Sequence, residues 1–271
     1  MPHFGFDGFD IAYEQRGRKQ GAGERPIVLI HGLLLPRKHH YPLADALADQ
    51  GNRVILIDLL GHGESDMPPH SRFHSMELYG RQVVALLDHL DIPEAVIGGT
   101  SLGANVALEV AFHNPERTKG LLIEMPVLEH AAPAAALIFL PLTIAYAQAA
   151  TAIGWFGRLV RRIPSTGSTY PDVLLEVLGR EPLPSAAVIH GLITGRLCVH
   201  PSDREKIEQP TLIIGHTRDV LHPFSDAEAL DRELPDCELI QAKSFFELRY
   251  PPNRLSDRIA DFLDEVWGPR P

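Results

Sequence analysis

The sequence predicts an α/β protein with a mostly parallel central sheet, helices on both faces of that sheet, and one inserted helical segment. Short apolar runs that are nearly continuous recur along the chain, as is typical of parallel strands buried on both faces. Segments with apolar residues at helical spacing separate most of these runs. Such alternation of strands and helices indicates an open sheet with helices packed on either side.

The elements can be placed in chain order. Residues 4–15 space apolar side chains with polar ones and predict an antiparallel edge hairpin that turns at Asp7-Gly8. Helices are expected at 75–90, 102–113 and 256–266, with Ser75 as an N-cap. The buried strands are expected at 27–30, 54–57, 95–98, 121–123, 211–214 and 238–240.

The strand spacing breaks once, between residues 123 and 211. Within this interval, residues 130–157 contain no Asp, Glu, Lys or Arg, but Pro133 and Pro141 interrupt the stretch. A membrane-spanning helix needs about 20 consecutive apolar residues. We therefore expect an apolar lid or buried helical layer, with docking on a membrane surface as the less favoured alternative and a spanning helix disfavoured. The predicted division is a core at 1–125 and 210–271 with a helical insertion at 126–209.

Charge and cysteine content exclude several classes of protein. The 271 residues include 25 Lys and Arg against 35 Asp and Glu, a formal net charge of −10 that argues against a nucleic-acid or anionic-membrane binder. Two cysteines, Cys198 and Cys237, cannot form a disulfide framework and indicate a reducing compartment. Because no signal peptide is recognised at the N-terminus, we expect a cytoplasmic protein, for which a homodimer is compatible with the sequence.

The strongest catalytic motif is Gly99-Thr100-Ser101-Leu102-Gly103. It follows the expected strand at 95–98 and opens the expected helix at 102–113, which is the strand–turn–helix context that gives a G-x-S-x-G match its meaning. The flanking glycines let strand and helix approach closely. The serine hydroxyl then lies at a helix N-terminus, where the dipole and free N–H groups favour a developing negative charge.

Two further motifs accompany this serine turn. His31-Gly32-Leu33 follows the first parallel strand, and residues 61–66, Gly-His-Gly-Glu-Ser-Asp, follow the next. With these motifs the chain resembles the α/β-hydrolase fold family over nearly its whole length, and the insertion at 126–209 falls where that family has its cap domain. The resemblance implies that the predicted sheet, its flanking helices and the inserted cap together adopt the α/β-hydrolase fold.

The resemblance also implies roles for individual residues. Ser101 would be the nucleophile, and the backbone N–H groups of Leu33 and Leu102 would form the oxyanion hole. His31 and His62 match positions that are structural in the family, where they hold turns together. A serine nucleophile suits acyl transfer, whereas the dehalogenase and epoxide hydrolase branches of the fold use an aspartate, so those two branches are disfavoured.

The sequence supports a candidate for the acid better than a candidate for the base. Asp219, in the loop after the strand at 211–215, resembles the family's acid, and Glu124, at the end of the strand at 121–123, is a second candidate. The family's histidine should follow the last strand, but Phe245 takes that position and no histidine occurs after His222. His222 is the best substitute base, although a histidine there can equally line the pocket. His216 and His130 are weaker candidates.

The leading functional prediction is a cofactor-free serine hydrolase, esterase-like or thioesterase-like, that acts on a small apolar ester or acyl substrate with an atypical or absent histidine base. No metal site, nucleic-acid partner or integral membrane segment is expected. One alternative is a catalytically silent protein of this fold that binds an apolar small molecule or a partner, because Phe245 would occupy the space of the base. Another is a different cofactor-free chemistry, such as C–C hydrolysis or a lyase reaction.

Overall fold

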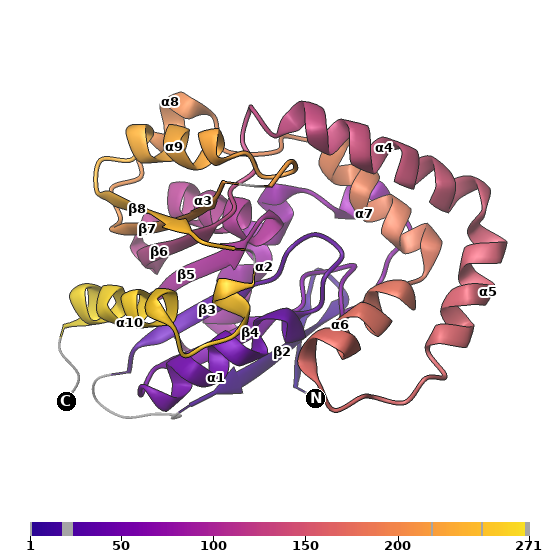
Figure 1. Ribbon diagram of the computed structural model, residues 1–271, viewed down its shortest axis with the longest axis horizontal. Helices are drawn as coiled ribbons and strands as arrows, with labels where there is room; N and C mark the ends of the chain where they lie inside the picture. Colours follow the sequence, from indigo (N-terminus) through magenta and orange to yellow (C-terminus); the bar gives the residue numbers. More distant parts are fainter. Residues whose placement is uncertain (1, 18–23, 218, 245, 269–271) are drawn as a thin grey trace.

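The computed structural model describes residues 2–17, 24–217, 219–244 and 246–268, and these form an eight-stranded sheet in the order β1-β2-β4-β3-β5-β6-β7-β8 (Figure 1). This arrangement confirms the predicted fold class. The strands are β1 (His3–Phe6), β2 (Phe9–Arg16), β3 (Pro26–Ile30), β4 (Arg53–Ile57), β5 (Ala95–Thr100), β6 (Thr118–Glu124), β7 (Thr211–His216) and β8 (Cys237–Ala242).

The first two strands form the antiparallel edge of the sheet. They pair through a turn at Asp7 and Gly8, whose φ angles of 48° and 85° both lie in the left-handed region. β2 pairs antiparallel with β4, and the remaining neighbours, from β4 through β8, pair in parallel. Because parallel strands all end on the same edge of a sheet, the loops that follow β3, β5, β6 and β7 meet there.

Helices cover both faces of the sheet (Figure 1). α1 (Tyr41–Asp49) and α10 (Arg254–Trp267) pack on one face with the apolar side chains that point that way. On the other face lie α2 (Met76–His89), α3 (Leu102–His113) and α9 (Phe224–Glu233). Short 3-10 helices occur at Arg37–His40, Ser71–Phe73, Pro115–Arg117 and Glu247–Arg249. The sheet is thus enclosed on both sides, which leaves the strand ends as the place for a site.

The helices between β6 and β7 extend beyond that edge of the sheet (Figure 1). They are α4 (Ala132–Gln148), α5 (Ala150–Val160), α6 (Thr169–Leu178), α7 (Pro182–Thr194) and the short α8 (Pro201–Arg204). Among the described residues no single helix is long and apolar enough to cross a membrane. α4 and α5 reach that length and composition only together, and they meet at a bend of 93°.

Two buried polar side chains fasten this helical layer to the core. Asn105 on α3 donates to the carbonyl oxygens of Val127 and Leu197 at 2.7 and 2.9 Å, which ties the two ends of the insertion to one residue. Asp226 on α9 is fully buried and accepts from the backbone N–H groups of Leu128 and Ala131 at 2.8 and 3.0 Å. These hydrogen bonds fix the segment just before α4 relative to α9 and the core.

Candidate active site

Ser101 occupies the sharp turn between β5 and α3. Its φ and ψ angles are 57° and −111°, a conformation that costs a residue with a side chain about 1–3 kcal/mol. A Cβ atom on Gly103 would lie 2.1 Å from the carbonyl oxygen of Ile30, and one on Gly99 would lie 2.6 Å from the same oxygen. Only glycine fits at these two positions, which explains the spacing of the motif. The turn projects the serine hydroxyl beyond the strand ends.

A chain of hydrogen bonds joins Ser101 to Asp219 through His222. His222 Nε2 lies 2.8 Å from Ser101 Oγ, and His222 Nδ1 lies 2.8 Å from Asp219 Oδ2. When Nδ1–H donates to the carboxylate, Nε2 keeps its lone pair and can accept the serine proton. The three groups therefore have the mutual geometry of a nucleophile, a base and a residue that orients the base.

The acid and the imidazole are held by one short turn. Backbone N–H groups of Leu221 and His222 donate to Asp219 Oδ1 at 2.9 and 3.0 Å. Burial opposes ionisation of Asp219, but the hydrogen bond from the His222 ring and these two backbone N–H groups outweigh it and hold the pKa of Asp219 below its usual value. The carboxylate is thus ionised and fixed where it can orient the imidazole.

Glu124, the second candidate acid, lies in a different environment. Its carboxylate accepts from Arg249 Nη2 at 2.8 and 2.9 Å and from the hydroxyl of Thr100, all of them buried. Burial opposes ionisation, yet the charge of Arg249 and the surrounding hydrogen bonds hold the pKa of Glu124 below its usual value. Glu124 is therefore an ionised partner of Arg249, and its backbone oxygen accepts from the N–H of Ser101 at 2.9 Å.

The weaker histidine candidates contact other carboxylates. His216 Nε2 lies 3.4 Å from a carboxylate oxygen of Glu124, and His130 Nδ1 lies 2.8 Å from a carboxylate oxygen of Asp226. Phe245, which takes the position expected for the family's histidine, lies outside the described residues. Of the histidines considered from the sequence, His222 is the one with a hydrogen bond to Ser101 in the described part of the chain.

The turn after β3 places Leu33 beside the serine. His31 is buried and shapes this turn, because its Nδ1–H donates to the carbonyl of Gly32 at 2.8 Å while its Nε2 accepts from the N–H of Leu59 at 3.0 Å. Burial lowers the pKa of His31 to about 4, so the ring stays neutral and keeps both bonds at neutral pH. Leu33 and Leu102 border the same cavity as Ser101, and the N–H of Leu102, as the first helical residue of α3, has no acceptor within the helix.

An apolar cavity of about 50 Å³ opens over Ser101. Its polar lining side chains are Ser101 and Asn105, and Asn105 is already hydrogen-bonded to backbone. The insertion supplies much of the remaining wall through α4 and α7, with Ala135, Phe139, Ile189 and Leu192. A cavity of this size and composition suits a short apolar group attached to the reacting carbon.

The sequence did not single out Asn105 or the wall residues of α4 and α7. For the α4 part of the wall the usable signal was the uncharged stretch at 130–157, which marks apolar helices without saying which side chains face the serine. Within the described ranges, no three His, Cys, Asp or Glu side chains are grouped so that they could hold a metal ion.

Comparisons with known proteins agree with this architecture. The model of the α/β-hydrolase fold family matches residues 25–154. An uncharacterized protein of Mycobacterium tuberculosis is 28% identical over 278 residues, which cover 93% of this chain and 79% of that protein. The enol-lactonase of Burkholderia xenovorans matches with a TM-score of 0.77 at 19% identity, over 97% of this chain and 99% of its own. A thermophilic esterase of Thermogutta terrifontis matches with a TM-score of 0.76 at 24% identity, over 97% of both chains.

Proposed function

Because this chain is a protein of the α/β-hydrolase fold, we propose that it is a cofactor-free serine hydrolase that cleaves a small ester or thioester with an apolar acyl or alcohol part. The observation that carries the proposal is the pair of 2.8 Å hydrogen bonds that link Ser101 to His222 and His222 to Asp219. Nucleophile, base and orienting carboxylate are thereby in contact before any substrate arrives.

The acylation step follows from these contacts. Ser101 Oγ attacks the substrate carbonyl carbon while its proton passes to His222 Nε2, and the carbonyl π electrons move to the oxygen. The N–H groups of Leu33 and Leu102 then donate to that oxyanion, and Asp219 stabilises the imidazolium. When the tetrahedral intermediate collapses, the bond to the alcohol or thiol breaks and His222 returns the proton to the leaving group.

Deacylation repeats the sequence with water as the nucleophile. His222 takes a proton from water as its oxygen attacks the acyl carbon, and the same two N–H groups stabilise the second oxyanion. Collapse breaks the bond to Ser101 Oγ, which recovers its proton from His222, and the carboxylic acid leaves. No redox partner or external acid is consumed.

The cavity supports the choice of substrate class. Its wall is apolar, so a charged acyl group would lose its hydration without gaining a partner there. Its volume of about 50 Å³ favours short acyl chains, because only a short chain fits wholly inside it.

A panel of p-nitrophenyl esters of increasing acyl length tests this function. We expect turnover with a preference for short chains, and loss of that turnover in Ser101→Ala, because the variant lacks the attacking oxygen. Ligand binding without turnover in the wild type would instead support the silent-binder alternative and contradict the proposal. Turnover that survives Ser101→Ala would point to a chemistry in which this serine does not attack.

A further inference from the structure

α4 has an apolar surface on every side, although most of its side chains are not buried. Ala135 is the residue of this helix that is buried, while Leu137, Leu140 and Ile144 are exposed, Leu137 to 77%. A helix that is apolar all round normally lies inside a protein or a membrane. The polar Thr143 does not alter this character, because its hydroxyl donates back to the carbonyl of Phe139 within the same helix at 2.8 Å.

The apolar surface continues onto α5. Trp155 is 63% exposed, and Phe156 and Leu159 on the same helix are exposed as well. We call these six residues the apolar ridge: Leu137, Leu140, Ile144, Trp155, Phe156 and Leu159. Scattered apolar residues are normal on a protein surface, but several large exposed ones on two consecutive helices mark an interaction site.

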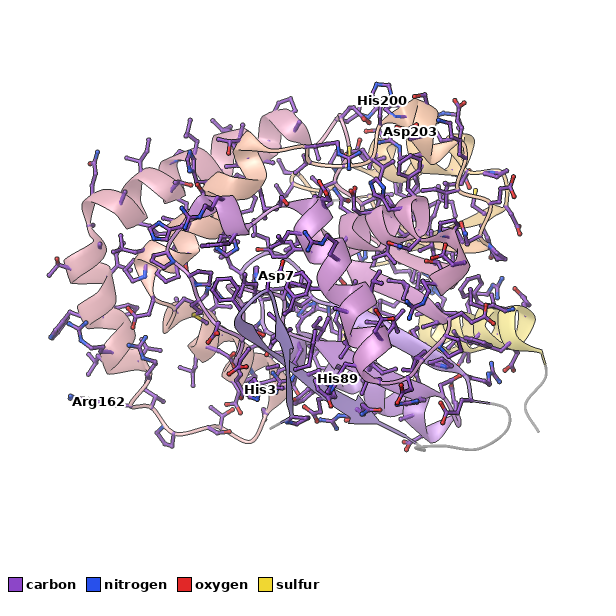
Figure 2. The ribbon with its side chains drawn as sticks, turned by 180° about the vertical axis from the view of Figure 1, so that it is seen from behind. His3, Asp7, His89, Arg162, His200 and Asp203 are labelled. Atoms are coloured by element: carbon purple, nitrogen blue, oxygen red, sulfur yellow. The ribbon has the colours of Figure 1, made fainter. Side chains whose placement is uncertain are left out.

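The charged residues that follow the ridge along the chain are arginines. Residues 130–157 contain no charged residue, and the first charges that follow are Arg158, Arg161 and Arg162. Arg161 is paired with Glu181 at 2.6 Å, whereas Arg158 and Arg162 are exposed and make no ion pair within the described residues. Figure 2 shows Arg162 at the outer edge of the molecule, just beyond the end of α5. This edge is locally cationic in a chain whose net charge is −10.

The shape of the ridge distinguishes between kinds of partner. α4 and α5 meet at 93° and form the outermost corner of the molecule, away from the sheet (Figure 1). A projecting apolar corner can insert into a lipid bilayer, whereas a protein partner would need a concave surface of matching shape. α5 carries large aliphatic and aromatic side chains together with Arg158, which is the composition of helices that lie in the interface of a bilayer with anionic lipids.

We propose that the corner formed by α4 and α5 docks the protein on an anionic membrane surface. The apolar ridge enters the boundary between headgroups and acyl chains, and Arg158 and Arg162 contact the lipid phosphates. The opposite side of α4 lines the cavity over Ser101 through Phe139, so docking would place that cavity next to the lipid. The docking itself requires no catalysis and stands independently of the proposed function.

Flotation of the full chain with lipid vesicles tests this proposal. We expect the protein to rise with phosphatidylcholine vesicles that contain about 30% phosphatidylserine, and to bind them at least about tenfold more strongly than vesicles of phosphatidylcholine alone.

Tryptophan fluorescence gives a second measurement of docking. In the variant Trp267→Phe, Trp155 is the one remaining tryptophan. Its emission should shift to shorter wavelength on binding, because the indole leaves water.

Paired variants separate the apolar and electrostatic contributions. Leu137→Gln/Trp155→Gln should weaken binding by at least about tenfold, whereas Leu137→Met/Trp155→Phe should retain it, because the second pair stays apolar. Arg158→Glu/Arg162→Glu should also lose at least about tenfold. The control Arg81→Glu/Lys206→Glu makes the same change of charge at other exposed positions, in ion pairs with Asp7 and Asp203, and should bind like the wild type.

Three outcomes would overturn the proposal. The first is no flotation with anionic vesicles at physiological salt while the protein is folded by circular dichroism. The second is equal loss of binding in the ridge variants and in the Arg81/Lys206 control. The third is a dimer by light scattering that dissociates in Leu137→Gln/Trp155→Gln without vesicle binding by the wild type, which would identify a second copy of the chain as the occupant.

Discussion

At the scale of single residues, the feature that distinguishes this site is that the proposed acid and the proposed base share one loop. Asp219 and His222 are three residues apart, and the aspartate holds both the backbone N–H and the ring Nδ1–H of the histidine. One turn therefore sets the distance between acid and base as well as the tautomer of the ring. The orientation of the base depends on the geometry of this loop after β7.

Asp219→Asn should lower kcat/KM by about 10⁴, because an amide can bind the imidazole in the tautomer that leaves a proton on Nε2. Ester hydrolysis followed at saturating and limiting substrate measures the loss. Asp88→Asn, an exposed carboxylate paired with Arg117, is the control and should retain activity. A loss of less than about tenfold in Asp219→Asn would show that another group orients His222.

At the scale of elements, the serine turn depends on close approach of backbone to backbone. Gly103→Ala would place a methyl group 2.1 Å from the carbonyl oxygen of Ile30, and backbone on both sides leaves little room to relax. We expect a loss of about 3 kcal/mol or more in the free energy of unfolding, measured by urea titration. Gly5→Ala in β1, where a Cβ meets nothing within 4 Å, should change stability little. Equal effects of the two substitutions would contradict this account of the motif.

The elements differ in how far the sequence predicts them. The six strands with apolar runs and the hairpin at Asp7-Gly8 are predicted correctly, because apolar runs and turn residues are local signals. The expectation that all six are buried is wrong for β8, which lies at the edge of the sheet and is only partly covered. α1 and α9 are not singled out, since α9 in particular is mostly polar and is held by Asp226. The contact of His222 with Ser101 joins residues 121 positions apart, so no local pattern reports it. Its position could be proposed from the sequence only by noting that no later histidine exists.

At the scale of the whole molecule, buried neutral histidines make stability depend on pH. Burial lowers the pKa of His31 and His40 to about 4 in the folded chain, against about 6.5 when unfolded. Below about pH 6.5 the unfolded state therefore binds more protons than the folded state, and the free energy of unfolding falls as pH falls from there toward 4. Each histidine accounts for a loss of about 2 kcal/mol between about pH 7 and about pH 5.

Urea titrations at these two pH values measure that loss. In His40→Gln the difference between the two pH values should shrink by about 2 kcal/mol relative to the wild type, whereas His190→Gln, at an exposed position, should leave it unchanged. A stability that does not change between the two pH values would contradict the burial of these rings.

The central claim is that His222 activates Ser101 within the hydrolase fold, and the rate of covalent labelling by a fluorophosphonate tests it most directly. Peptide mass analysis should find one adduct, on Ser101, and the labelling rate constant should fall by at least about 10³ in His222→Ala, because unassisted serine is a poor nucleophile at neutral pH. A wild type that does not label, or a His222→Ala variant that labels as fast as the wild type, would contradict the claim.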